Sequence, residues 1–191
     1  MTASDRELLE RSARGDRAAF GEFVEQHSAN VHRYLRWLVD DPNDVEDLLQ
    51  KTFVDAWRAA AQARADGGAR TWLLAIARRN AGKWLARRGA TREREQSLEE
   101  LGELAGFGDA QHTPEQMARA AEERSLVEQA LAALAPPERE ILVLRELEGV
   151  EGAAAAELLG LSLAAQKSRL HRARLRLAAE LRQRLRAEVD R

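Results

Sequence analysis

Apolar residues recur at the three- and four-residue spacing of an α-helix in most segments of this 191-residue chain, and this periodicity is its strongest constraint on the fold. The clearest example runs from Arg17 to Val39. The positions of its inward stripe are Phe20, Phe23, Val24, His27, Val31, Tyr34, Leu35 and Leu38. Alanine, leucine, glutamate and arginine dominate while aromatic residues make up 5%, a composition that favours helices over sheets. We therefore expect an all-α protein.

Two small helical domains joined by a flexible linker are the predicted organisation. After the first helix, a second is predicted from Asn43, as its N-cap, to about Ala61, and a third over Thr71–Arg88. From Gly89 to about Ala121 the periodicity is lost and glycines are frequent, which is typical of a linker. The predicted boundaries are residues 1–90 for the first domain, 91–118 for the linker and 119–191 for the second domain.

The second domain is predicted to contain a helix-turn-helix. A helix over about Ala118–Leu134 is followed by Pro136-Pro137, which opens another helix that reaches Leu147. Two further helices, Gly152–Leu159 and one that begins at Leu163, flank a short turn that contains Gly160 and the potential cap Ser162. Short helices joined by such a turn place the second helix in a DNA major groove.

The charges are distributed unevenly, although the formal net charge is only −2. From Arg70 to Arg94 there are eight basic residues and one acidic residue, and from Lys167 to Arg186 the balance is again eight to one. Between them, Glu95–Glu123 holds eight acidic residues and one arginine. Two basic segments separated by an acidic one indicate two nucleic-acid contacts joined by a linker.

The last helix carries the strongest sign of DNA binding. A helical wheel places Leu163, Leu170, Ala173 and Leu177 inward. The predicted outward residues are Lys167, Ser168, Arg169, His171, Arg172 and Arg176. Such a face can pair with phosphates and read guanine edges, and the alternative is a basic face that only meets solvent.

The third helix has a second candidate nucleic-acid face, and Arg70, which directly precedes this helix, is predicted to bind DNA together with it. The wheel groups Leu73, Leu74, Ala77, Ala81, Trp84 and Leu85 as core. It groups Trp72, Ile76, Arg79, Asn80, Lys83 and Arg87 as the contact face. An aromatic ring stacks on unpaired bases and an amide bonds their edges, so this face suits an opened strand. Trp72 could equally belong to the core.

Four stretches in this order resemble the extracytoplasmic-function sigma factors of the sigma-70 family. They are DVEDLLQKTFVDAW, TWLLAIARRNAGKWLARR, LAPPEREILVLRELEG and LLGLSLAAQKSRLHRARLRL. The resemblance implies that Asp47, Gln50 and Phe53 bind the clamp of core RNA polymerase. It implies that residues 66–88 melt and read the minus-ten promoter element, and that the DNA-binding residues of the last helix, Lys167, Ser168, Arg169, His171 and Arg172, bind the minus-thirty-five element. It also implies an anti-sigma factor as a partner.

Some positions depart from the pattern of that family. Ala63 and Ala69 stand where aromatic residues are common, and Gly152 and Ala155 stand where larger residues usually pack. Gln166 falls on the inward stripe, where the family usually has valine, and a buried amide needs a hydrogen-bond partner. We therefore predict a loosely packed second domain with weak or unusual promoter preference.

Catalytic and cofactor sites are not indicated. The chain has no cysteine, His27 and His32 lack further ligands nearby, and no phosphate-binding glycine loop occurs, so we expect no enzyme activity, metal or cofactor. No apolar run suits a signal peptide or membrane span, which predicts a cytoplasmic protein without membrane insertion. Two alternatives stay open: a helix-turn-helix regulator that does not bind polymerase, and a degenerate sigma relative that acts as a helical interaction protein.

Overall fold

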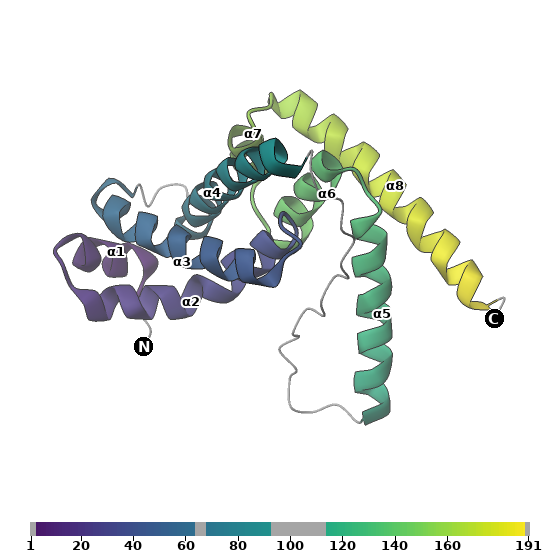
Figure 1. Cartoon of the computed structure of the whole chain (residues 1–191), viewed down its shortest axis with the longest axis horizontal. Coiled ribbons are helices and arrows are strands. Elements are labelled where there is room, and N and C mark those ends of the chain that lie inside the picture. The colour runs from purple at the N-terminus through teal and green to yellow at the C-terminus, as the bar shows by residue number, and fades with distance from the viewer. Residues whose placement is uncertain (1–2, 64–67, 93–113, 190–191) are drawn as a thin grey trace. The chain divides into compact units, whose positions relative to one another are not determined.

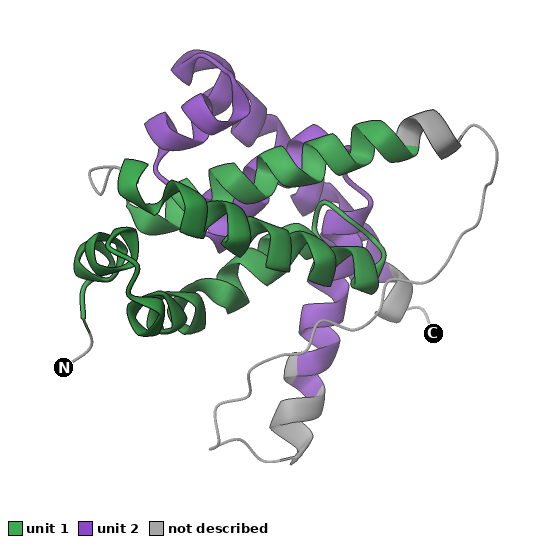
Figure 2. Ribbon diagram, turned by 60° about the vertical axis from the view of Figure 1, so that its left-hand side comes forward, with its two compact units in different colours: residues 1–102 green, residues 103–191 purple. Residues whose placement is uncertain are grey.

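A computed structural model describes residues 3–63, 68–92 and 114–189, and every regular element in these ranges is a helix (Figure 1). The predicted all-α class is confirmed. The chain divides into two compact units, Met1–Gly102 and Glu103–Arg191 (Figure 2). The predicted linker, residues 91–118, lies largely outside the described residues, and its exact boundaries stay a prediction.

The described residues of unit 1 form four α-helices and one short 3-10 helix. They are α1 (Asp5–Ala13), α2 (Arg17–Arg36), α3 (Pro42–Ala59), η1 (Ala60–Gln62) and α4 (Ala69–Arg92). The helix α2 starts where predicted because Asp16 caps it, accepting from the backbone N–H of Ala19 at 3.0 Å. This hydrogen bond is the largest cause that lowers the pKa of Asp16 below its usual value, and the hydrogen bond from the Arg11 guanidinium is the next largest.

Two helix starts in unit 1 differ from the prediction. Asp41, and not Asn43, caps α3, because Pro42 occupies the first helical position and Asp41 accepts from the backbone N–H of Asn43 at 2.9 Å. No helix was predicted before Arg17, yet α1 forms there behind the cap Ser4. Leu8 and Leu9 of α1 are buried, so this helix is part of the core of the unit.

The core of unit 1 forms where α1, α3 and α4 pack on α2. Its fully buried members include one aromatic residue from each half of α2 and aliphatic residues from all four α-helices: Leu8, Phe23, Val31, Tyr34, Leu35, Val45, Leu73, Leu74 and Ala77. This packing leaves one side of α2 and α3 and one side of α4 at the surface, and the candidate sites of the unit lie there.

Unit 2 contains α5 (Pro114–Ala132), α6 (Pro136–Leu142), the π-helical segment η3 (Val143–Leu147), α7 (Gly152–Leu159) and α8 (Leu163–Val189). Helix α8 packs on α5, α6 and α7 around a small aliphatic core. Helices α7 and α8 form the predicted helix-turn-helix. Gly160 ends α7 in the left-handed conformation, with φ of 67°, and Ser162 caps α8 by accepting from the N–H of Ala165 at 3.1 Å.

Candidate protein and nucleic-acid interfaces

A hollow of about 600 Å³ opens between α2 and α3, and we call it the α2–α3 groove. Its lining residues are Phe20, Val24, Ser28, Glu46, Asp47, Leu49, Gln50, Phe53, Val54 and Trp57. The three residues predicted to bind polymerase, Asp47, Gln50 and Phe53, all line it. Residues assigned to one surface by family resemblance are therefore neighbours around one concave site.

Both aromatic and acidic side chains line the α2–α3 groove. The ring of Phe20 meets Trp57 edge-on at 5.0 Å and Phe53 at 6.5 Å between centroids. Phe53 is only 7% exposed, so it offers a partner little surface beyond its ring edge. Glu46 and Asp47 are exposed. Such a groove suits an amphipathic helix with an apolar stripe and basic flanks.

Several lining residues were not predicted as part of this site. Phe20 and Val24 were assigned to the buried stripe of α2, but both are only half-buried because they open into the groove. Val54 was not among the residues predicted to bind polymerase, and it is 43% exposed at the groove. Its exposure adds apolar surface to the groove, which the sequence alone did not show.

The predicted faces of α4 are partly wrong. Leu73, Leu74, Ala77 and Ala81 are buried as predicted, but Ile76 and Asn80, which were placed on the contact face, are buried too. The reason is that α4 packs against both α2 and α3, which buries a wider arc than one neighbouring helix would. Asn80 is therefore not on an open surface.

Near the end of α4, two residues that were predicted to be buried are half-buried or exposed. Trp84 is half-buried and Leu85 is 44% exposed, although both were assigned to the core. The indole N–H of Trp84 donates to Asp44 at 3.2 Å, and the guanidinium of Arg88 stacks 4.7 Å over the Trp84 ring and donates to the same carboxylate at 2.5 Å. Asp44 thus ties the end of α4 to the start of α3.

The basic residues of α4 do not share one face. Arg79, Lys83 and Arg87 are exposed, and Trp72 is half-buried. Arg70 precedes Arg79 by nine residues, about two and a half turns, so it lies on the opposite side of the helix. There its guanidinium donates to the side-chain oxygen of Asn30, at 3.0 and 3.2 Å, in the amide orientation that satisfies both groups. We call Trp72, Arg79, Lys83 and Arg87 the α4 basic face.

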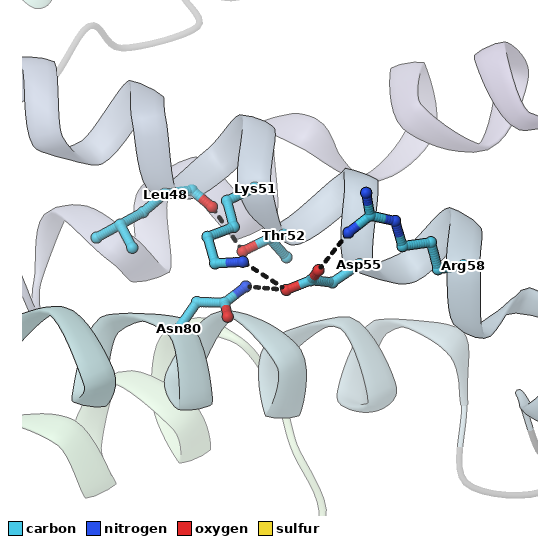
Figure 3. Close-up of polar contacts among 6 residues, drawn as sticks. All are labelled: Leu48, Lys51, Thr52, Asp55, Arg58 and Asn80. Atoms are coloured by element: carbon cyan, nitrogen blue, oxygen red, sulfur yellow. Dashed lines mark hydrogen bonds and ion pairs between the residues drawn. The ribbon is translucent and has the colours of Figure 1, made fainter.

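Asn80 belongs to a polar network between α3 and α4 (Figure 3). Its amide donates to Asp55 Oδ2 at 3.1 Å, and Lys51 Nζ donates to the same oxygen at 3.2 Å. Arg58 lies 3.9 Å from the other carboxylate oxygen. Burial alone would raise the pKa of Asp55, but the hydrogen bonds from Asn80 and Lys51 outweigh it and the pKa is lowered. Asp55 was not predicted as a site residue.

The outward side of α8 is largely as predicted. Lys167, Ser168, His171 and Arg172 are exposed on one arc, which we call the α8 basic face, and Arg169 is half-buried at its edge. Arg176 is exposed as predicted, and it also donates to both oxygens of Glu138 on α6, at 2.5 and 2.6 Å. Leu163 was predicted to face inward but is exposed, because it lies in the first turn of α8.

Gln166 faces inward as predicted. It is 1% exposed, and its Nε2 has no hydrogen-bond partner. Its Oε1 lies 3.7 Å from the point where a Cβ on Gly152 would stand, so the small residue on α7 leaves room for the longer side chain on α8. The predicted loose packing of this domain is not tested by these contacts, but the unpaired amide is consistent with it.

Comparisons with known proteins follow the same two-unit division. Residues 23–91 match the family Sigma-70 region 2, and residues 124–177 match Sigma-70, region 4. The RNA polymerase sigma factor CnrH of Cupriavidus metallidurans is 34% identical over 181 residues, which cover 93% of this chain and 94% of that protein. The chain belongs to the extracytoplasmic-function sigma factors of the sigma-70 family.

Further relatives agree with this assignment. The ECF RNA polymerase sigma-E factor of Haemophilus influenzae is 30% identical to this sigma factor over 174 residues, 90% of this chain and 92% of that protein. A solved structure of CnrH in complex with the cytosolic domain of CnrY matches with a TM-score of 0.64 at 30% identity, and covers 95% of this chain and 99% of that one. RpoE of Bartonella quintana, solved with the anti-sigma factor NepR, has the same fold, with a TM-score of 0.68 at 21% identity over 85% of this chain and 96% of that one.

The predicted function as an RNA polymerase sigma factor is confirmed by these matches, which assign this sigma factor to the transcription initiation factors. The alternative of a regulator that does not bind polymerase fails to account for region 2.

The two histidines that were considered as metal ligands do not share a site. His27 and His32 bond to different carboxylates, Asp5 at 2.8 Å and Glu46 at 3.2 Å. Within the described ranges, no helix is long and apolar enough to cross a membrane.

Proposed function

We propose that this sigma factor brings core RNA polymerase to its promoters through three surfaces. The α2–α3 groove binds the polymerase, the α4 basic face binds the opened minus-ten element, and the α8 basic face binds the minus-thirty-five element as duplex DNA. Polymerase carries out the chemistry, so the chain itself is not an enzyme, and it acts in the cytoplasm, where polymerase and promoters are found. Its selectivity comes from DNA contacts and from the cost of unpairing bases.

The α8 basic face gives the strongest support for this proposal. Lys167, Ser168, His171 and Arg172 are exposed together on a helix that a capped turn introduces, which is how a recognition helix presents side chains to a major groove. The nearby arginines Arg174 and Arg176 are used differently, because they pair with Glu146 and Glu138 and fix the helix to its own domain. Recognition and docking of α8 are thus divided between different residues.

Substitution in the groove tests polymerase binding. Val54→Asp introduces a charge at an exposed position of the α2–α3 groove, and Leu85→Asp introduces the same charge at an equally exposed position on α4, outside the groove. We expect Val54→Asp to abolish co-elution with purified bacterial core RNA polymerase, and Leu85→Asp to retain it. Equal affinity of both variants for the polymerase would refute the assignment of the groove.

We further propose a protein inhibitor as a partner, of the anti-sigma type that the resemblance implies. The solved structure of CnrH holds the cytosolic domain of CnrY as a second protein. An inhibitor that covers the α2–α3 groove would compete directly with polymerase. In a titration monitored by co-elution, we expect such an inhibitor to displace polymerase from the wild-type chain. We expect Val54→Asp to weaken binding of the inhibitor as well.

A degenerate relative that no longer initiates transcription is the second candidate, and the unpaired amide of Gln166 in the recognition domain is the observation that favours it. Run-off transcription with purified core polymerase decides between them. Transcripts that depend on both promoter DNA and this chain are expected for a sigma factor, and a degenerate relative would give none.

A further inference from the structure

Side-chain hydrogen bonds join α3 and α4 both at Asp44, near the end of α4, as described above, and at Asp55, near the middle of α4. The amide of Asn80 on α4 donates to the carboxylate of Asp55 on α3 across the helix interface (Figure 3). Asn80 is 4% exposed, so its amide is enclosed between the helices and does not face solvent. The bond therefore lies behind the α4 basic face and not on it.

The surroundings of Asp55 make this a strong contact. A carboxylate acceptor forms stronger hydrogen bonds than a neutral one, and partial burial strengthens the bond further. Lys51 donates to the oxygen that Asn80 uses, and Arg58 lies near the other oxygen. The lowered pKa of Asp55 keeps the group ionised near neutral pH. Asn80 would have to give up a charged partner before it could bond to a base.

The neighbours of the two residues belong to different surfaces. Val54, next to Asp55, lines the α2–α3 groove, while Arg79, next to Asn80, and Lys83, one turn further, belong to the α4 basic face. A rotation of α4 that separates Asn80 from Asp55 would therefore move Arg79 and Lys83 relative to the groove. The bond helps to fix the relative position of the two surfaces, together with the bonds that Asp44 accepts from the end of α4.

We propose that the Asp55–Asn80 hydrogen bond is a positioning contact that holds the α4 basic face in a fixed orientation to the polymerase-binding groove, without touching DNA or polymerase. This inference rests on the proposed function of both surfaces. It differs from the expectation that Asn80 reads a base directly. If Asn80 contacts a base, removal of Asp55 leaves promoter opening intact; if Asn80 acts by positioning, removal of either partner causes the same defect.

The test uses the full chain, purified bacterial core RNA polymerase and a promoter selected with the wild-type holoenzyme from a random DNA library. We expect Asn80→Ala and Asp55→Ala each to lower run-off transcription on the order of tenfold, the effect of one hydrogen bond to a charged group, with the double variant no worse. Affinity for core polymerase should stay within about twofold, since neither residue lines the groove.

A matched control separates this effect from general destabilisation. Ser12→Ala removes another buried hydrogen bond of unit 1, from Ser12 Oγ to the carbonyl of Leu8 at 2.6 Å, which joins nothing to α4. Thermal unfolding is measured for every variant. We expect both Ser12→Ala and Asn80→Ala to unfold at a lower temperature than the wild-type chain, but only Asn80→Ala to lower transcription.

An exchange of the two side chains gives a second, independent readout. Asn80→Asp alone opposes two carboxylates and should be the most defective variant. Combining it with Asp55→Asn restores an amide facing a carboxylate and should recover transcription. Four results would each overturn the inference. Two concern the pair: failure of that rescue in a folded double variant, or additive defects of the two alanine variants. The other two are full activity of Asp55→Ala and a loss of polymerase affinity that matches the loss of transcription. If the wild-type chain itself does not support transcription, the proposed function fails first and the inference with it.

Discussion

Arg172 and Arg176 lie one turn apart on α8, and their surroundings assign them different tasks. Arg172 is exposed on the α8 basic face, whereas Arg176 pairs with Glu138, whose side chain is only 11% exposed. We expect Arg172→Ala to weaken promoter binding and to reduce the slope of log affinity against log salt by about one, with unchanged stability. Binding titrations at several salt concentrations measure this slope.

Arg176→Ala should have the opposite profile. It leaves the Glu138 carboxylate without its partner, which we expect to cost about 1–2 kcal/mol of unfolding free energy, at the lower end because the Arg176 side chain is itself 60% exposed. Denaturant unfolding measures the cost. If Arg176→Ala lowers the salt slope as much as Arg172→Ala while its stability stays at the wild-type value, the division of tasks on α8 is wrong.

Gln166 offers a prediction about stability alone. Its buried Nε2 has no partner, so Gln166→Met, which keeps the length of the side chain and removes the amide, should stabilise the chain by about 1–2 kcal/mol. Calorimetry on the full chain measures the shift. The exposed Gln183→Met is the matched control and should change stability by less than about 0.5 kcal/mol. A destabilised Gln166→Met would mean that the amide is satisfied in solution.

At the scale of the helices, two glycines should respond in opposite directions to alanine. Gly160 ends α7 with φ of 67°, where a Cβ is strained, so Gly160→Ala should destabilise the helix-turn-helix by about 1 kcal/mol or more. Gly82 lies inside α4 with open space around it, so Gly82→Ala should stabilise by about 0.5–1 kcal/mol. Thermal unfolding compares the pair, and shifts in the same direction would contradict the assigned conformation of the turn.

Most helices could be predicted from apolar periodicity, and the exceptions have physical causes. Helix α1 is short and polar outside its buried pair of leucines, so it gave little periodic signal, yet Ser4 followed by Glu7 is a capping-box pattern that marks its start. The faces of α4 were harder to predict because a helical wheel assumes one buried side, while α4 packs against two helices. Its buried arc therefore includes Ile76 and Asn80.

At the scale of the whole molecule, the two basic segments that are proposed to bind DNA were visible in the sequence, whereas the groove was not. Runs of basic residues are local, so the two segments stand out even though the net charge is close to zero. The α2–α3 groove instead combines residues 20–28 with residues 46–57, and its shape depends on how two helices pack. Only family resemblance pointed to Asp47, Gln50 and Phe53, and it did not reveal Phe20, Val24 or Trp57.

Both basic faces are expected to act on the same DNA molecule. Once one face is bound, the linker keeps the other face close to the same DNA, so the second contact forms more readily and the overall affinity rises. This holds provided that the linker lets both faces engage. We expect the charge reversals Arg79→Glu with Lys83→Glu, on α4, and Lys167→Glu with Arg172→Glu, on α8, each to lower promoter binding by the holoenzyme by at least about tenfold. Each pair should leave affinity for core polymerase unchanged, because all four residues lie outside the groove.

Run-off transcription by core polymerase with the chain carrying both charge-reversed pairs measures whether promoter recognition depends on the two basic faces. We expect this variant still to co-elute with polymerase but to give no promoter-specific transcript, while the wild-type chain gives one. A transcript at the wild-type level from the fourfold variant would mean that promoter recognition does not depend on the basic faces of α4 and α8.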